Sequence, residues 1–240
     1  MDLEKLYDNP VKLEIKNKIL FADNKTIEPS IRTVEAMQEV VLKKETTLKS
    51  DTVLYYMYRA PASKETIRFD ITVILPNMLG IEYVKTYGHY HQEAEKGFDY
   101  PEIYQVLQGE VAFILQKRTT ENSVDVIICK AKKGDCILMP PNYGHVSVNT
   151  GKEKLIMSNL VSSKFQSDYA SYKQKKGAAI YYTTNGIVKN PNYKINRIEE
   201  LSAEELNERY GIDSKDLLSE LYSDPKKFEY LENPSLLEKK

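Results

Sequence analysis

Three histidines and one glutamate in the middle of the sequence are candidate ligands of a metal ion. The chain of 240 residues has only three histidines, and all of them fall between residues 89 and 145. His89 and His91 lie two residues apart in a GHYH segment, so on an extended strand both imidazoles point to the same face. Glu102 begins the next strand-like segment, and His145 follows later in the chain. Imidazole nitrogens and a carboxylate oxygen suit a divalent transition metal.

A histidine pair on one strand is, by itself, more typical of ordinary core or surface residues. Three further spacings support a metal site here: Glu-x6-Gly at 102–109, Gly-x5-Pro at 134–140 and His-x3-Asn at 145–149. No histidine is left outside this arrangement. We therefore expect one metal site that includes all three histidines and a carboxylate.

The carboxylate has alternatives in the sequence. Ten residues, QEAEKGFDYP, separate His91 from Glu102 and must form a loop. The loop contains Glu93, Glu95 and Asp99, any of which could replace Glu102 as a ligand. Only Glu102 has the six-residue spacing to the glycine at 109.

Strand-like segments position these residues from Thr52 onward. Segments with period-two alternation or many β-branched and aromatic residues cover 52–60, 66–76, 82–91, 102–118, 124–131, 135–140, 155–163 and 178–184. Strands at such short spacing predict a closed barrel or a sandwich. Gly109-Glu110 indicates a hairpin turn inside 102–118, and Asn185-Gly186 indicates another after 184.

The two ends of the chain have different patterns. Residues 11–17 (VKLEIKN) alternate as a strand, whereas the apolar residues within 31–41 repeat at helical spacing. The segment 202–205 (SAEE) is a capping box that predicts the start of a helix, and further helical segments follow. We predict three parts: N-terminal strands and a helix packing on the barrel (1–50), the barrel (51–195) and a helical C-terminal extension (196–240).

The composition restricts the class of protein. Hydrophobic residues make up 41% of the chain and charged residues 29%, as in ordinary globular domains. A net charge of −1 gives no global field that would attract nucleic acid or an anionic membrane. Residues 1–15 are too charged for a signal peptide, so Cys129 and Cys136 are expected to be buried, reduced thiols. We expect a cytoplasmic protein with neither nucleic acid nor membrane as a partner.

The combined spacings resemble the paired motifs of the cupin superfamily. In cupins the first motif supplies two histidines and a glutamate, and the second supplies a third histidine; His89, His91, Glu102 and His145 match these ligands. The resemblance implies an all-β fold, the cupin double-stranded β-helix (jelly-roll) barrel, here with a short N-terminal α/β segment and a C-terminal helical tail. It also implies one divalent metal ion per subunit, and Fe, Mn, Ni and Zn all suit these ligands.

A closer resemblance connects three segments, TYGHYH, PEIYQVLQGEVAFILQ and MPPNYGHVSVNTG, to the cupin-type glucose-6-phosphate isomerases best known from archaea. It covers about residues 18–190 and favours iron as the metal. By this resemblance Thr72, Thr86 and Gly88 hold the sugar phosphate, and Tyr104 and Tyr169 line the site. A glycine lets its backbone amide approach a phosphate closely, and a threonine hydroxyl adds a donor.

The sequence departs from the archaeal enzymes at two positions of the site and at the end of the chain. Val161 stands where they have a phosphate-contacting tyrosine, and Ser167 stands where they have a histidine. The tail after about residue 196 has no counterpart in the short archaeal enzymes. These departures concern phosphate binding and substrate identity, and they leave the metal ligands unchanged.

The resemblance implies a metal-dependent isomerase that interconverts glucose 6-phosphate and fructose 6-phosphate in glycolysis and gluconeogenesis. Glu102 is the best candidate for moving the proton between C1 and C2, with Tyr104 assisting through a hydrogen bond; a metal-assisted hydride shift would need no base. The alternatives are another cupin sugar-phosphate isomerase, a dioxygenase, and a non-catalytic sugar-binding cupin. We also expect a homodimer with the N-terminal strands at its interface.

Overall fold

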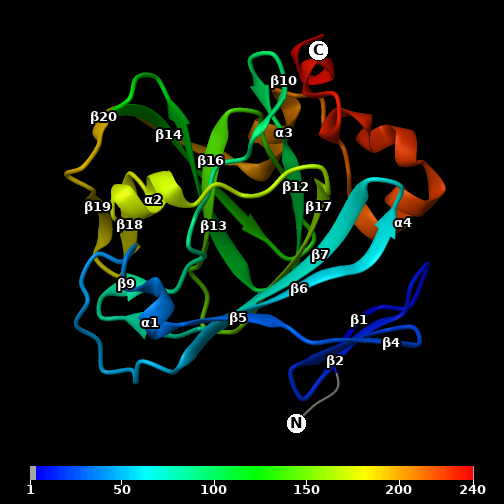
Figure 1. Cartoon of the computed structure of the whole chain (residues 1–240), viewed down its shortest axis with the longest axis horizontal. Coiled ribbons are helices and arrows are strands. Elements are labelled where there is room, and N and C mark those ends of the chain that lie inside the picture. The colour runs from blue at the N-terminus through cyan, green and yellow to red at the C-terminus, as the bar shows by residue number, and fades with distance from the viewer. Residues whose placement is uncertain (1–3, 240) are drawn as a thin grey trace.

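Two β-sheets face each other across a shared apolar interior and form the barrel of the protein (Figure 1). The structure is a computed structural model that describes residues 4–239. The first sheet has the strand order β15 (Cys136–Met139), β12 (Glu102–Gln108), β17 (Leu155–Ser162), β7 (Ile67–Ile74), β6 (Val53–Lys64) and β5 (Ser30–Thr33). The second sheet has the order β16 (Tyr143–Asn149), β13 (Glu110–Arg118), β14 (Ser123–Lys132) and β20 (Lys194–Ser202).

The chain passes back and forth between the two sheets, which is the winding of a jelly roll. After β12 in the first sheet, β13 and β14 lie in the second, and β15, β16 and β17 then alternate between the sheets. Neighbouring strands are antiparallel except β14 and β20, which pair in parallel. This arrangement confirms the predicted all-β double-stranded β-helix barrel.

Gly109 marks a crossing between the sheets and not a hairpin turn. The hairpin predicted there is wrong, because β12 pairs with β15 and β17 whereas β13 pairs with β14 and β16. Gly109 has a φ of +84°, and a Cβ atom there would lie 3.0 Å from the carbonyl oxygen of Lys154 and 3.1 Å from the Cα of Leu155. Glycine adopts this left-handed conformation without a steric penalty, so the chain can cross close to the start of β17.

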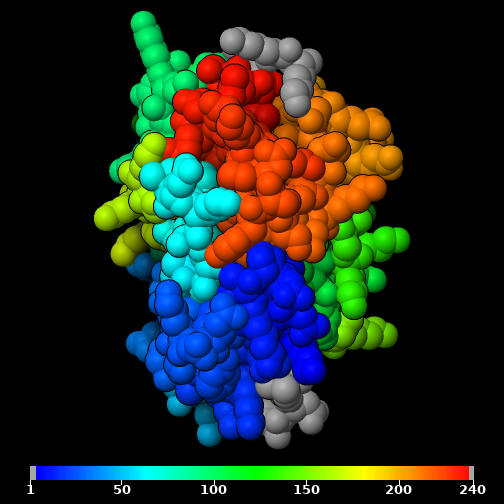
Figure 2. Space-filling model, turned by 90° about the vertical axis from the view of Figure 1, so that its right-hand side faces the viewer, coloured from blue at the N-terminus to red at the C-terminus, as the bar shows by residue number. Residues whose placement is uncertain are grey.

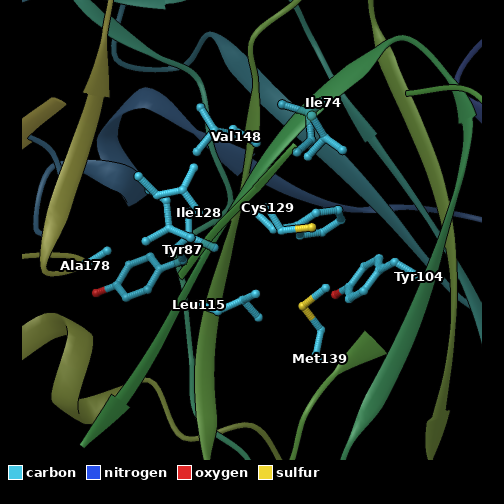
Figure 3. Close-up of a cluster of buried hydrophobic side chains, with 14 of the residues drawn as sticks. Ile74, Tyr87, Tyr104, Leu115, Ile128, Cys129, Met139, Val148 and Ala178 are labelled. Carbon is cyan, nitrogen blue, oxygen red and sulfur yellow. The ribbon is translucent and has the colours of Figure 1, made fainter. Parts of the chain in front are cut away.

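Alternation along β6 divides its side chains between the inside and the outside of the barrel. Tyr55 and Met57 belong to the interior cluster, whereas Tyr56 and Tyr58 belong to a second cluster on the outer face of the same sheet. Figure 3 shows part of the interior cluster, to which both sheets contribute, with Ile74, Tyr104, Leu115, Ile128 and Val148 among the labelled side chains. Because the outer face is apolar as well, another layer must cover it.

Segments from opposite ends of the chain form that covering layer. The N-terminal meander consists of β1 (Glu4–Tyr7), β2 (Leu13–Lys16), β3 (Ile19–Ala22) and β4 (Lys25–Ile27), and the C-terminal tail contains α4 (Leu217–Ser223), η1 (Pro225–Leu231) and η2 (Pro234–Lys239). Leu13, Leu20, Leu217, Leu221 and Phe228 are fully buried in the outer cluster. Figure 2 shows the blue meander beside the orange and red tail on this face.

The chain completes the second sheet before its helical tail begins. Residues 194–202 form β20, whereas the sequence pattern placed 196–202 in a helical extension. Ser202 then starts α3 (Ala203–Glu208) with the predicted capping box: its hydroxyl accepts from the Glu205 N–H, and the Glu205 side chain accepts from the Ser202 N–H. Among the helices of residues 4–239, none has the length and hydrophobicity needed to cross a membrane.

The long helix predicted within 31–41 is wrong. Residues 30–33 are strand β5, because Ile31 pairs with Tyr56 of β6. Thr33 then caps a single helical turn, α1 (Val34–Met37), by accepting a hydrogen bond from the Ala36 N–H. Val40 is fully buried although it lies beyond the helix. The apolar spacing therefore reflects burial of an irregular segment.

A small sheet, in the order β19 (Gly186–Lys189), β18 (Ile180–Thr183), β9 (Glu82–Tyr83) and β8 (Met78–Leu79), packs against the barrel. The predicted hairpin at Asn185-Gly186 is confirmed by the pairing of β18 with β19. Lys85, just after β9, is fully buried with its Nζ 2.5 Å from Glu82 Oε1. The same Nζ donates to the Val40 carbonyl oxygen, and Glu82 Oε2 accepts from the Leu42 N–H. This buried ion pair fastens residues 40–42 to the segment that leads to His89.

Phe228 provides a test of the covering layer. Replacing it with alanine removes a fully buried ring from the outer cluster, so we expect Phe228→Ala to lower the free energy of unfolding by about 3–5 kcal/mol. Leu236→Ala, at a side chain that is 37% exposed in the same tail, should change it little. Urea unfolding of both variants measures the difference. Equal effects of the two substitutions would show that the tail does not pack as described.

Candidate metal centre

Residues 84–91 run beside β16 and bring His89 next to His145. A continuous strand was predicted over 82–91, but beyond β9 the segment has only isolated bridges, including Lys85 with Val148 and His89 with His145. The His145 N–H donates to the His89 carbonyl oxygen at 3.1 Å. The rings of His89 and His91 lie side by side, with their centroids 4.9 Å apart. The two imidazoles therefore point in the same direction, as expected, although residues 84–91 do not form a regular strand.

Glu102 reaches the histidines from the opposite sheet. It is the first residue of β12, and its Oε2 lies 3.2 Å from His145 Nε2 and 3.4 Å from His91 Nε2. His89 Nε2 lies 3.0 Å from His91 Nε2. One potential ligand atom from each of the four residues lies within 4.8 Å of the others, and all but His89 are buried. The fold thus joins the four candidate ligands into one cluster.

The hydrogen bonding of His91 shows that this cluster fits a cation. His91 Nδ1 lies 2.7 Å from the Tyr100 carbonyl oxygen, which can only accept, so in the neutral ring Nε2 carries the lone pair. That lone pair faces the His89 ring and the Glu102 carboxylate. Metal–ligand bonds of about 2.1 Å at right angles place neighbouring ligand atoms about 3.0 Å apart, close to the separations seen here. The donor set and its spacing fit one divalent transition-metal ion.

The protonation states favour the same conclusion. Burial lowers the pKa of His89 well below its ordinary value and also lowers the pKa of His145. Burial opposes ionisation of Glu102, but a proton on His145 or His91 outweighs it and lowers the Glu102 pKa well below its usual range, so the carboxylate is ionised when a positive charge, from a proton or a metal ion, lies in the cluster. Neutral imidazoles and an ionised carboxylate are the forms that bind metal ions.

The acidic loop that offered alternative ligands folds into a separate hairpin, β10 (Glu93–Glu95) and β11 (Phe98–Asp99). Glu93 Oε1 accepts from the Gly97 N–H, and Glu95 Oε2 accepts from the Ser235 N–H in the tail. Within residues 4–239, the group of potential ligands includes Glu102 and no acidic residue of this hairpin.

A pocket of about 330 Å³ opens beside the cluster. The residues expected to contact the substrate all line it together with three of the candidate ligands: Thr72, Thr86, Gly88, Tyr104, Tyr169, His89, His91 and Glu102. His145 lies behind this lining and is 1% exposed. The structure therefore places the expected substrate and metal residues in one location.

Gly88 and Thr86 are held in place by their neighbours. Gly88 has a φ of +87°, and a Cβ there would lie 2.5 Å from the Tyr172 ring and 2.6 Å from the Val146 side chain. Only glycine fits this position, so packing requires it independently of any phosphate. Thr86 Oγ1 accepts from the Ser147 N–H at 3.0 Å, which leaves the hydroxyl hydrogen available to a ligand.

Tyr104 and Tyr169 place aromatic rings beside the histidines. The Tyr104 hydroxyl lies 3.5 Å from His145 Nε2, and burial raises the Tyr104 pKa well above its ordinary value, so this phenol is neutral. The Tyr169 ring centroid lies 5.4 Å from that of His89. Both tyrosines therefore lie beside the cluster.

Several residues that line the pocket were not identified from the sequence, among them Arg59, Arg68 and Phe165. Arg59 lies where the pairing of β6 with β7 shifts register, between Tyr58 and Ala62, so strand alternation does not report the direction of its side chain. The Phe165 ring centroid lies 4.4 Å from that of His91. Phe165 lies in an irregular segment, where no periodic sequence pattern predicts the direction of a side chain.

A jelly-roll barrel with a pocket lined by histidines and a glutamate defines a cupin. A family model described as "Glucose-6-phosphate isomerase (GPI)" matches residues 29–198, which is most of the chain. The chain therefore belongs to the glucose-6-phosphate isomerase (GPI) family, as the sequence motifs predicted.

Individual relatives carry the same name. The chain is 31% identical to the glucose-6-phosphate isomerase of Thermococcus gammatolerans over 156 residues, 63% of this chain and 78% of that protein. It is 28% identical to the glucose-6-phosphate isomerase of Pyrococcus furiosus over 200 residues, 79% of this chain and 100% of that protein. Among solved structures, an oxalate decarboxylase of Lactobacillus farciminis aligns with a TM-score of 0.36 and 19% identity, over 48% of this chain and 30% of that chain.

Metal binding can be measured through stability. Adding Mn²⁺ or Zn²⁺ to the metal-free protein should raise its melting temperature, because an ion that binds only the folded state at 100 times its Kd adds about 2.7 kcal/mol. Glu102→Gln keeps the shape of the side chain but removes its charge, and it should abolish most of this rise. Glu93→Gln, on the neighbouring hairpin, should preserve it. A rise that depends on Glu93 and not on Glu102 would assign the carboxylate ligand to the hairpin.

Proposed function

We propose that the protein is a metal-dependent aldose–ketose isomerase that interconverts glucose 6-phosphate and fructose 6-phosphate. The observation that carries this proposal is the convergence of His89, His91, Glu102 and His145 beside a hydroxyl-lined pocket, in a chain of the GPI family. The relatives from Thermococcus and Pyrococcus are named for this activity. The reaction moves a hydrogen between C1 and C2 of an open-chain sugar, and the weak acidity of the C–H group beside the carbonyl makes it difficult.

The three histidines and Glu102 would hold the ion. When bound, a divalent ion supplies Lewis-acid stabilisation of the negative charge that develops on the sugar oxygens. Glu102 can also move the proton, because its carboxylate borders the pocket and Oε2 is the oxygen that faces His91 and His145. We assign Oε1 as the oxygen that accepts the proton at one carbon and returns it at the next.

Tyr104 would orient the substrate. Its hydroxyl is a donor that lines the pocket beside the cluster. A hydrogen bond from this hydroxyl to a sugar oxygen would stabilise charge that develops there. A hydride shift between C1 and C2 would use the same hydrogen bond but no base, so Glu102 is the residue that distinguishes the two routes.

The proposal extends to the ion, the cellular role and the assembly. Fe, Mn, Ni and Zn all suit the ligands, and the family resemblance favours iron. The reaction belongs to glycolysis and gluconeogenesis, in the cytoplasm. A homodimer through the N-terminal region is supported by β5, an edge strand of the first sheet whose Ile31 is 46% exposed. Metal analysis of the purified protein and its mass in solution test these points.

Activity can be tested with a coupled assay that detects glucose 6-phosphate formed from fructose 6-phosphate. We expect activity that disappears with a chelator, returns when a divalent ion is restored, and is lost in His89→Ala. The restored wild-type sample is the control for irreversible unfolding. Activity that survives complete metal removal, or is undiminished in His89→Ala, would overturn the metal-dependent mechanism.

The role of Tyr104 can be separated from packing with a conservative substitution. Tyr104→Phe removes only the hydroxyl, so we expect kcat to fall about 10- to 100-fold, on the order of one hydrogen bond that strengthens in the transition state. The melting temperature should change little. Tyr83→Phe, at a partly buried tyrosine of the small sheet, is the matched control. An unchanged kcat in Tyr104→Phe would leave Tyr104 with a packing role alone.

A further inference from the structure

Two arginines enter the same pocket from the first sheet. Arg59 of β6 and Arg68 of β7 both line it, with side chains that are 44% and 29% exposed. Both bind the buried carboxylate of Asp70: Arg59 Nη1 lies 2.7 Å and Arg68 Nε 2.9 Å from its Oδ2. One carboxylate neutralises only one of two guanidinium charges, so this side of the pocket keeps a net positive charge.

A bulge in β6 aims Arg59 at the pocket. The pairing of β6 with β7 shifts register between Tyr58 and Ala62, and Ala60 has a φ of +53°, a conformation that non-glycine residues rarely adopt. The Ala60 N–H donates to Asp70 Oδ1 at 2.8 Å. Asp70 therefore holds the bulge and both guanidinium groups in one arrangement, and bulges commonly redirect side chains next to sites.

Arg68 shares a cross-strand row with Glu102. Glu102 of β12 lies opposite Val161 of β17, and Val161 lies opposite Arg68. With neighbouring strands about 4.8 Å apart, the Cα atoms of Arg68 and Glu102 are about 10 Å from each other. An open-chain hexose phosphate has this order of length. The short side chain of Val161 lines the pocket between the two ends and leaves the space open.

We propose that Arg59 and Arg68 form a subsite that binds the phosphate group of the substrate, in addition to Thr72, Thr86 and Gly88 in the same pocket lining, while the reacting carbons lie at the histidine cluster. Guanidinium groups form strong, often bidentate hydrogen bonds with phosphate. Arg68 donates a hydrogen bond from Nε to Asp70. The two terminal nitrogens of Arg68 have no hydrogen bond within residues 4–239, so they can donate to a phosphate group. The subsite rests on the proposed function in one respect, namely that the substrate is a phosphomonoester.

The subsite can be tested with inorganic phosphate and with the substrate. Isothermal titration of the metal-loaded full-length protein measures the phosphate Kd, and steady-state kinetics measure KM and kcat for fructose 6-phosphate. Arg59→Gln and Arg68→Gln should each raise Kd and KM about 10- to 100-fold, as expected for the loss of a hydrogen bond to a charged group, with a smaller change in kcat. Arg59→Lys keeps the charge but loses the planar fork, so its effect should be intermediate. Arg197→Gln, at a side chain that is 61% exposed on β20, should leave both constants unchanged.

The outcomes separate the subsite from the proposed function. Phosphate binding that depends on the arginines, without isomerase activity, would support the subsite and reject the isomerase. Isomerase activity with unchanged KM and phosphate Kd in both glutamine variants would overturn the subsite and retain the isomerase. Wild-type protein that does not bind phosphate would overturn the subsite as well.

Chemical protection provides a second measurement if a glutamine variant does not fold. An arginine-specific dicarbonyl reagent, with the modified residues mapped by mass spectrometry, should modify Arg59 and Arg68 of the wild-type protein more slowly when phosphate is present. The modification of Arg197 should not change. Equal modification of Arg59 and Arg68 with and without phosphate would overturn the subsite.

Discussion

The pairing of residues 84–91 with β16 is the interaction on which the site depends. It sets His89 opposite His145, and His91 then follows on the same face because alternate residues of an extended chain share a face. Backbone hydrogen bonds hold the segment, among them one from the Thr86 N–H to the Ser147 carbonyl oxygen and a pair between Tyr90 and Asp168, and side-chain packing adds to them. Gly88 fits against the Tyr172 ring, and the fully buried Lys85 is bound to Glu82. A buried ion pair is costly to break, which makes the position of this segment well determined.

The outer layers of the protein reach the same cluster through His91. Its Nδ1 donates to the carbonyl oxygen of Tyr100, the residue that follows the β10–β11 hairpin. The hairpin is bonded in turn to the C-terminal tail, where the Ser235 N–H donates to Glu95 Oε2 at 2.8 Å. The tail is held by the apolar outer face of the first sheet, in which Phe228 is fully buried. Burial of the tail on the outer face of the first sheet therefore helps to orient the His91 ring, through the β10–β11 hairpin and Tyr100.

The sequence was most informative where a local pattern determines a local structure. The two-residue spacing of His89 and His91 predicted adjacent rings, and the capping box at Ser202 predicted the start of α3. The pattern failed at Gly109 and over residues 31–41, because a turn residue does not specify which strands pair and apolar spacing does not specify a helix when strand pairing is available. Arg59 was missed for a related reason: its direction depends on a bulge fixed by Asp70, and that contact crosses between strands.

The polar residues inside the first sheet explain why this end of the barrel is a pocket and not a continuation of the core. Glu102 and Asp70 are buried carboxylates on inward-facing positions, whereas apolar residues such as Ile74 occupy the inward-facing positions at the other end of the sheet. A buried charge is tolerated only with partners. Asp70 has two guanidinium groups and a backbone N–H, whereas Glu102 faces the Nε2 atoms of His91 and His145, and in His91 this atom carries the lone pair. One end of the pocket is therefore rich in donors and positive charge, and the other is rich in acceptors that a cation would satisfy. A ligand with an anionic group at one end and metal-binding oxygens at the other matches both ends at once.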